Sequence, residues 1–140
     1  MVYADTSALV KLVLVEAGSA ELLGLVSGIT VMASASIAYV ELRAALAAAH
    51  RDHRLPRRRL IEARGALEKV WQATSPLDVD GDLVQDAGEL AEQMRLKGYD
   101  AVHLAALRRL GTAVEVDFVA CWDGALRIAA TQLGYRLFPA

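Results

Sequence analysis

Four carboxylates stand at positions where they could carry out chemistry: Asp5, Glu41, Asp100 and Asp123. Asp5 and Asp123 each follow a predicted strand and precede a predicted helix, and Asp100 stands at a predicted helix start, two residues after a glycine. Ligands of open α/β domains bind at the carboxyl edge of the sheet, where such strands end. Each aspartate could equally be only a helix N-cap, worth about 1 kcal/mol. For Asp5 alone, the two interpretations are equally good.

Glu41 differs from the aspartates because it lies within residues 37–46, a predicted helix with almost no other charge. A carboxylate in mid-helix cannot be a cap, and an unpaired buried charge is costly. Arg43, two positions away, points off another side of the helix. We therefore expect the partner of Glu41 to be a metal ion shared with the three aspartates. The helical neighbours of Glu41 are Ile37, Ala38, Ala44 and Ala45.

Oxygen ligands of this kind suit Mg²⁺ and Mn²⁺, which are hard cations. Without a cation, four clustered carboxylates would repel one another. With one or two Mg²⁺ ions about 4 Å apart, such a site can hydrolyse a phosphodiester by activating a water and stabilising the leaving oxygen. Thr6 or Ser7 could add a hydroxyl to the metal shell or to the scissile phosphate. His103 lies one turn after Asp100, and we expect it to pack and hydrogen-bond locally rather than to act in catalysis.

Strands and helices are predicted to alternate along the chain, which indicates βαβ units and a parallel sheet covered on both faces. We expect one α/β domain over residues 1–140 with a surplus of helix. Serine 34 or serine 36 is the predicted cap of the third helix, and Gly111 the predicted end of the sixth. Strands are predicted at 2–4, 29–33, 77–79, 114–121 and 136–138, and helices at 7–13, 17–27, 37–50, 57–73, 80–97, 100–110 and 123–133.

Composition narrows the class of protein. The 140 residues are 55% hydrophobic with a mean hydropathy of +0.32, yet no apolar run approaches the roughly 18 residues of a membrane span. The N-terminus lacks the pattern of a secretory signal, so we expect a cytoplasmic protein that does not associate with a membrane. The single cysteine, Cys121, excludes an internal disulfide.

Positive charge is concentrated in one stretch. Residues 51–69 hold seven basic and three acidic residues, a net charge of +4, so the rest of the chain carries −6 out of a total of −2. This asymmetry is typical of a protein with a polyanionic partner, although a solvated helix face is the simpler alternative. The candidate RNA-contacting residues are Arg51, Arg54, Arg57, Arg58 and Arg59.

Four stretches together resemble the PIN domain, and within it the VapC-type ribonuclease toxins of toxin–antitoxin pairs. They are YADTSALVKL at 3–12, IAYVELRAAL at 37–46, YDAVHLAA at 99–106 and DFVACWD at 117–123. The resemblance implies a three-layer α/β/α fold with a short parallel sheet of strand order 3-2-1-4-5. It also implies Mg²⁺- or Mn²⁺-dependent endoribonuclease activity on RNA, a homodimer, and neutralisation by a small VapB-type antitoxin.

Carried over by position, the resemblance makes Asp5, Glu41, Asp100 and Asp123 the catalytic and metal-binding acids. Two residues depart from the family pattern. Cys121 stands where many relatives have threonine or serine, and Gly124 stands where they often have a basic residue. Cys121 lacks the hydroxyl that the family pattern provides near Asp123. Gly124 lacks the basic side chain that would contribute to substrate binding there.

Two other functions are compatible with parts of this sequence. A phosphorylation-controlled receiver domain also binds Mg²⁺ with aspartates at strand ends, but it needs two adjacent acids after the first strand, and this chain has Asp5-Thr6 there. A PIN-like module that binds RNA or a partner without cleaving it is the second alternative. The complete set of four acids argues against that alternative.

Overall fold

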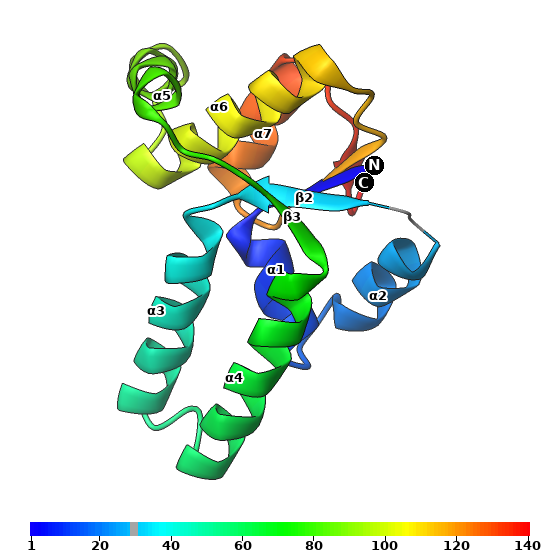
Figure 1. Cartoon of the computed structure of the whole chain (residues 1–140), viewed down its shortest axis with the longest axis vertical. Helices are drawn as coiled ribbons and strands as arrows, with labels where there is room; N and C mark the ends of the chain where they lie inside the picture. The colour runs from blue at the N-terminus through cyan, green and yellow to red at the C-terminus, as the bar shows by residue number, and fades with distance from the viewer. Residues whose placement is uncertain (29–30) are drawn as a thin grey trace.

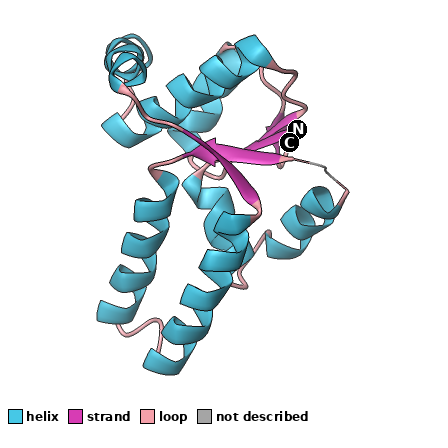
Figure 2. Ribbon diagram, in the orientation of Figure 1, coloured by secondary structure: helices cyan, strands magenta, loops and turns pink. Residues whose placement is uncertain are grey.

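The computed structural model describes residues 1–28 and 31–140, and within them the chain forms seven helices around a five-stranded parallel sheet (Figures 1 and 2). The strand order is β3-β2-β1-β4-β5, which confirms the predicted fold class. Every strand pairs in parallel with its neighbour. The strands are β1 (Val2–Ala4), β2 (Met32–Ala35), β3 (Thr74–Leu77), β4 (Phe118–Ala120) and β5 (Leu137–Phe138).

The helices cover both faces of the sheet, because successive strand side chains point to opposite faces. Tyr3, Ala33 and Val119 face a core formed with α5, α6 and α7, whereas Val2, Ala4 and Ala120 face a core formed with α1, α2, α3 and α4. Figure 1 shows α3 and α4 running side by side away from the sheet. The helices are α1 (Thr6–Val13), α2 (Ser19–Ser27), α3 (Ala38–Arg51), α4 (Arg57–Gln72), α5 (Gly81–Met94), α6 (Gly98–Ala113) and α7 (Gly124–Gln132).

Helix α6 begins earlier and ends later than predicted. It starts at Gly98 with Lys97 as an N-cap that makes no side-chain bond, so Asp100 lies in the first turn and does not open the helix. A negative charge there is favoured by the helix dipole, while the carboxylate stays free of capping. Gly111 lies inside α6, which continues to Ala113. A Cβ at this position would collide with the hydroxyl of Tyr135, so glycine makes room for that side chain. Its role is close packing rather than helix termination.

The prediction that Ser34 or Ser36 caps the third helix is wrong. Strand β2 continues through Ser34 to Ala35, and α3 begins at Ala38 with Ile37 in the N-cap position and no side-chain capping bond. Because the helix starts this late, Glu41 lies in its first turn and not in its middle. Glu41 therefore stands close to the end of β2.

The strand boundaries also differ from prediction. Strand β4 has three residues because its pairing with β1 spans only Val2–Ala4 and its pairing with β5 is shorter still. The preceding residues 114–117 lie outside the sheet. Strand β3 occupies 74–77, where Pro76 is tolerated because β3 is at the edge of the sheet. The first part of the predicted strand at 29–33 lies at residues 29–30, outside the described residues.

Two helix boundaries have local causes. Helix α1 begins at Thr6, because Asp5 and not Thr6 or Ser7 is its N-cap. Helix α2 begins at Ser19 and not at residue 17, because Gly18 adopts a left-handed backbone with φ of 89°. In the parts of the chain that the structure describes, no helix combines the length and the apolar character needed to cross a membrane.

Candidate active site at the carboxyl edge of the sheet

Asp5 lies at the junction of β1 and α1, almost fully buried. Its Oδ1 accepts a hydrogen bond from the backbone N–H of Ala8 at 2.9 Å, so it does cap α1. Ser7 Oγ donates to the same carboxylate at 2.7 Å. Burial raises the pKa of Asp5, and the electrostatic effect of His103 and the hydrogen bonds from Ser7 and Ala8 only partly oppose this. Asp5 is thus both a cap and a buried acid at the sheet edge.

Asp123 occupies the equivalent position at the junction of β4 and α7. Its Oδ1 accepts from the backbone N–H groups of Ala125 and Leu126 at 2.9 and 3.0 Å. The junctions of Asp5 and Asp123 are tied together, because the N–H of Trp122 donates to Ser7 Oγ at 2.7 Å. Since β1 and β4 are neighbours in the sheet, these two acids are held on adjacent strand ends.

Cys121 bridges the same two junctions. Its Sγ donates to Asp5 Oδ2 at 3.3 Å and lies 3.6 Å from the carbonyl oxygen of Asp123. The thiol therefore donates a hydrogen bond to Asp5, as a hydroxyl at this position would, although a thiol is the weaker donor. Burial and the nearby charge of Asp5 raise the pKa of Cys121, so the thiol keeps its proton. The departure from the family pattern at this position preserves a hydrogen-bond donor.

Asp100 reaches the site from the first turn of α6. Its carboxylate accepts no hydrogen bond from any residue in 1–28 or 31–140. Partial burial raises the pKa of Asp100, and the negative charges of Asp123 and Asp5 raise it further, against the opposing influence of His103 and Lys97. The carboxylate of Asp100 is therefore repelled by both Asp5 and Asp123.

Glu41 joins this group through hydrogen bonds from other elements. Its Oε2 accepts from Thr6 Oγ1 at the start of α1 and from His103 Nε2 on α6, the latter at 2.8 Å. Partial burial would raise the pKa of Glu41, but these hydrogen bonds outweigh that effect and hold the pKa below its ordinary value. Glu41 therefore has hydrogen-bond partners in the protein that the sequence did not indicate. Its partners lie 35 and 62 residues away in the sequence, beyond the reach of helix-neighbour arguments.

His103 belongs to the site to a greater extent than the sequence indicated. It is buried, and its Nδ1 lies 2.9 Å from the hydroxyl of Tyr3 on β1. Its Nε2 contacts Glu41 and lies 3.2 Å from Thr6 Oγ1. Sequence reasoning noticed the spacing of one turn from Asp100 but missed Tyr3 altogether. Burial, followed by the charge of Asp5, raises the pKa of Tyr3 well above its ordinary value, so the phenol keeps its proton.

The arginine cluster lies elsewhere. It occupies the tip of the α3–α4 hairpin, the end farther from the sheet in Figure 1. Arg51 follows Glu41 by roughly 15 Å along the axis of α3. Arg54 pairs with Asp52 at 3.2 Å, and Arg58 and Arg59 both approach Glu62, at 3.2 and 3.8 Å. The structure thus separates these arginines from the acids instead of bringing them into one site.

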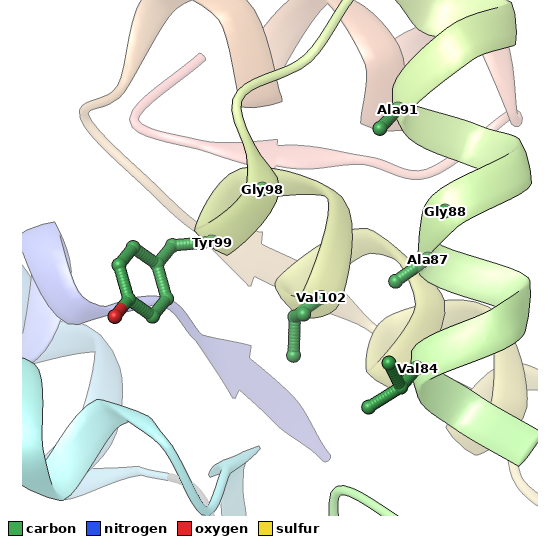
Figure 3. A pocket seen from close by; sticks show the side chains of 7 residues that line it. All are labelled: Val84, Ala87, Gly88, Ala91, Gly98, Tyr99 and Val102. Atoms are coloured by element: carbon green, nitrogen blue, oxygen red, sulfur yellow. The ribbon is translucent and has the colours of Figure 1, made fainter. Parts of the chain in front are cut away.

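An apolar groove of about 390 Å³ lies between α5 and α6 (Figure 3). It was not predicted from the sequence. The side chains of Val84 and Tyr99 that line it are 52% and 62% exposed. The lining residues are Val84, Ala87, Gly88, Ala91, Gly98, Tyr99 and Val102.

The acids fit a divalent cation in chemistry and charge. All four offer oxygen donors, and the unpartnered, repelled carboxylate of Asp100 is the kind of group that a cation would stabilise. As the side chains stand, however, no three Asp, Glu, His or Cys residues of the described chain are grouped so that they could hold a metal ion.

Comparison with known proteins agrees with this geometry. The model of the PIN domain family matches residues 2–115. Ribonuclease VapC49 of Mycobacterium tuberculosis strain H37Rv and ribonuclease VapC45 of strain CDC 1551 are each 42% identical to this chain over 140 residues, which is all of this chain and 96% of each relative.

Two solved structures share the fold. The Mycobacterium tuberculosis toxin VapC20, described as cleaving the sarcin–ricin loop, superposes with a TM-score of 0.68 at 19% identity over 92% of this chain and 95% of that one. A chain of VapBC2 from Rickettsia felis, bound to a DNA fragment from its promoter, gives a TM-score of 0.65 at 13% identity over 98% and 97%. The chain belongs to the PIN domain family, and within that family to the VapC-type proteins.

Proposed function

We propose that this chain is the ribonuclease toxin of a toxin–antitoxin pair and that it hydrolyses RNA phosphodiester bonds with the help of Mg²⁺, for which Mn²⁺ would substitute. The observation that carries the proposal is that the four acids come together at one edge of the sheet. Asp5 and Asp123 follow adjacent strands, and His103 links Glu41 to the helix that carries Asp100. The names of the relatives, which are 42% identical over the whole chain, support the nuclease activity.

Asp5, Glu41, Asp100 and Asp123 would hold the metal. A bound divalent ion would supply a Lewis acid that lowers the pKa of a water and offsets charge on the phosphate. The chain itself orients the acids. Ser7 and Cys121 hold Asp5, and Thr6 and His103 hold Glu41. Because the hydroxyls of Thr6 and Ser7 both donate to carboxylates, the structure supports a positioning role for them better than direct binding of phosphate.

Replacing Asp100 tests the proposal most cleanly. Its carboxylate accepts no hydrogen bond from the described residues, so Asp100→Asn removes a charge without breaking a contact. We expect RNA cleavage to fall by at least about 100-fold, which corresponds to roughly 2.7 kcal/mol of transition-state stabilisation. Gel analysis of RNA fragments, with EDTA as the metal-free reference, measures this.

The matched control is Glu115→Gln, which removes the same charge from an exposed loop outside the site. Cleavage by this variant should equal that of the wild type. If Asp100→Asn cleaved as fast as Glu115→Gln in buffer containing Mg²⁺, the acids would not form the catalytic site.

The arginine cluster is the proposed contact for RNA phosphates remote from the cleaved bond. Arg51 and Arg57 have no ion-pair partner among the described residues, so both are available to a polyanion. The hairpin would then extend the RNA-binding surface by roughly the length of α3, about 20 Å.

Two protein partners are part of the proposal. A VapB-type antitoxin would inhibit the chain, since the Rickettsia felis structure contains such a toxin–antitoxin pair. Loss of cleavage on addition of that antitoxin would support this. A second copy of this chain would cover the groove between α5 and α6, whose exposed Val84 and Tyr99 form an apolar surface on two packed helices. Light scattering distinguishes a dimer from a 15.0 kDa monomer.

A further inference from the structure

A continuous set of hydrogen bonds runs from the core of the sheet to the acidic site. It begins at the hydroxyl of Tyr3, which is fully buried on β1 and lies 2.9 Å from Nδ1 of His103. It continues from Nε2 of His103 to Oε2 of Glu41 at 2.8 Å. The proposed metal-binding roles give no function to the buried phenol of Tyr3 or to the buried imidazole of His103, which connects Tyr3 to Glu41.

The chemistry of Tyr3, His103 and Glu41 determines which group donates and which accepts in each of these hydrogen bonds. An ionised carboxylate only accepts hydrogen bonds, so Nε2 of His103 must carry a hydrogen to bond Glu41. A neutral imidazole then has a lone pair on Nδ1, which accepts from the phenolic O–H of Tyr3. The two neighbours of His103 thereby select one of its tautomers.

These hydrogen bonds restrict the conformation of the Glu41 side chain. It is long, and 22% of its surface is exposed, so without contacts it would sample several rotamers. Thr6 and His103 both bond Oε2, and no described residue bonds Oε1. One oxygen is thus fixed by two different elements while the other remains available. Because His103 lies one turn from Asp100 on α6, the same bond also links Glu41 to the helix that carries Asp100.

We propose that Tyr3 is a positioning residue, which fixes His103 as the Nε2–H tautomer so that His103 holds Glu41 with Oε1 available to a divalent cation. This inference rests on the proposed function for the identity of the cation. The tautomer and the placement of Glu41 follow from the contacts alone.

Tyr3→Phe removes only the hydroxyl and keeps the ring in the core. In the wild type at pH 7.5, ¹⁵N NMR of the His103 ring should show one species, with Nε2 protonated and Nδ1 unprotonated. In Tyr3→Phe the ring loses one of its two anchors, and its signals should broaden or split. Calorimetric titration with Mn²⁺ should show affinity lowered by about five- to tenfold, the loss associated with one hydrogen bond.

Tyr135→Phe is the matched control. Tyr135 also donates a hydrogen bond from a partly buried hydroxyl, to the carbonyl of Leu107, but it takes no part in the set. Its loss should leave both the His103 signals and Mn²⁺ affinity unchanged. An equal loss of affinity in both variants would overturn the proposal, because the effect would then be general loosening.

The remaining outcomes separate the positioning role from the metal. Wild-type His103 with hydrogen on Nδ1, or unchanged signals and affinity in Tyr3→Phe, would overturn the positioning role. If the wild type bound no Mn²⁺ but His103 showed the expected tautomer and lost it in Tyr3→Phe, the metal proposal would fail while the role of Tyr3 in holding His103 stood.

Discussion

Hydrogen bonds hold three of the four acids, and the role of these bonds differs from one acid to the next. Asp5 and Asp123 cap α1 and α7, so they contribute to stability as well as to the site. Glu41 is held by side chains of α1 and α6. Asp100 alone has no hydrogen-bond partner among the described residues, and burial and neighbouring charge raise its pKa. The ionised carboxylate of Asp100 is therefore repelled by the carboxylates of Asp5 and Asp123.

This repulsion predicts a pH dependence for the stability of the metal-free chain. A carboxyl with a raised pKa in the folded state binds its proton more tightly there than in the unfolded chain, so its stabilising contribution is present at low pH and is lost as the pH rises. The asparagine of Asp100→Asn does not ionise, so the stability of this variant does not decrease in this way as the pH rises. In EDTA, the melting temperature of the variant should exceed that of the wild type at pH 7.5, and the gap should shrink as the pH falls towards 4.

Calorimetric melting curves at several pH values measure this gap, with Glu115→Gln as the control for a simple change in net charge. A gap that stayed constant from pH 7.5 to pH 4 would show that Asp100 is not strained by its neighbours.

At the scale of helices and strands, the order of elements could be predicted but several of their ends could not. Alternating patterns predicted the parallel sheet, and the strong periodicity of residues 80–97 predicted α5. The cap of α3 was misplaced, because pairing of β2 with β3 carries Ser34 into the sheet and the backbone N–H of Ser36 donates to the carbonyl of Leu77. These tertiary contacts override the capping preference of the two serines. The start of α6 was misplaced because Asp100 resembles a cap in sequence, whereas Lys97 occupies the N-cap position in the structure.

The α3–α4 hairpin leads to a prediction of its own. If its tip contacts RNA phosphates, the double variant Arg51→Gln with Arg57→Gln should weaken RNA binding and reduce the salt dependence of the affinity by up to about two charges. The cleavage rate at saturating RNA should be unchanged, since the tip lies about a helix length from the acids. Fluorescence anisotropy at several salt concentrations measures the binding.

Arg108→Gln is the control, because it removes one positive charge from α6, where Arg108 pairs with Asp86. Binding by this variant should keep the wild-type salt slope. If the double variant also kept that slope, the arginines would be no more than a solvated helix face.

For the whole molecule, the central observation is that four segments spread over about 120 residues bring their acids to one edge of the sheet. The convergence of Asp5 and Asp123 was predictable, because parallel strands all end at the same edge. The approach of Asp100 was not, because α6 follows α5 and not a strand. The hydrogen bonds behind it were not, since Tyr3 and His103 are 100 residues apart and neither follows a local pattern. The side chains of the described residues do not form a group of three metal-binding residues. Whether the four acids share one cation is therefore the question that a binding experiment must answer.

Calorimetric titration of the metal-free protein with Mn²⁺ tests this account most directly. The wild type should bind Mn²⁺ with a saturable heat that Mg²⁺ competes away, and Glu115→Gln should match it. Asp100→Asn should bind at least about tenfold more weakly, because one oxygen ligand has lost its charge. No saturable binding to the wild type, or equal binding to Asp100→Asn, would contradict a shared cation site.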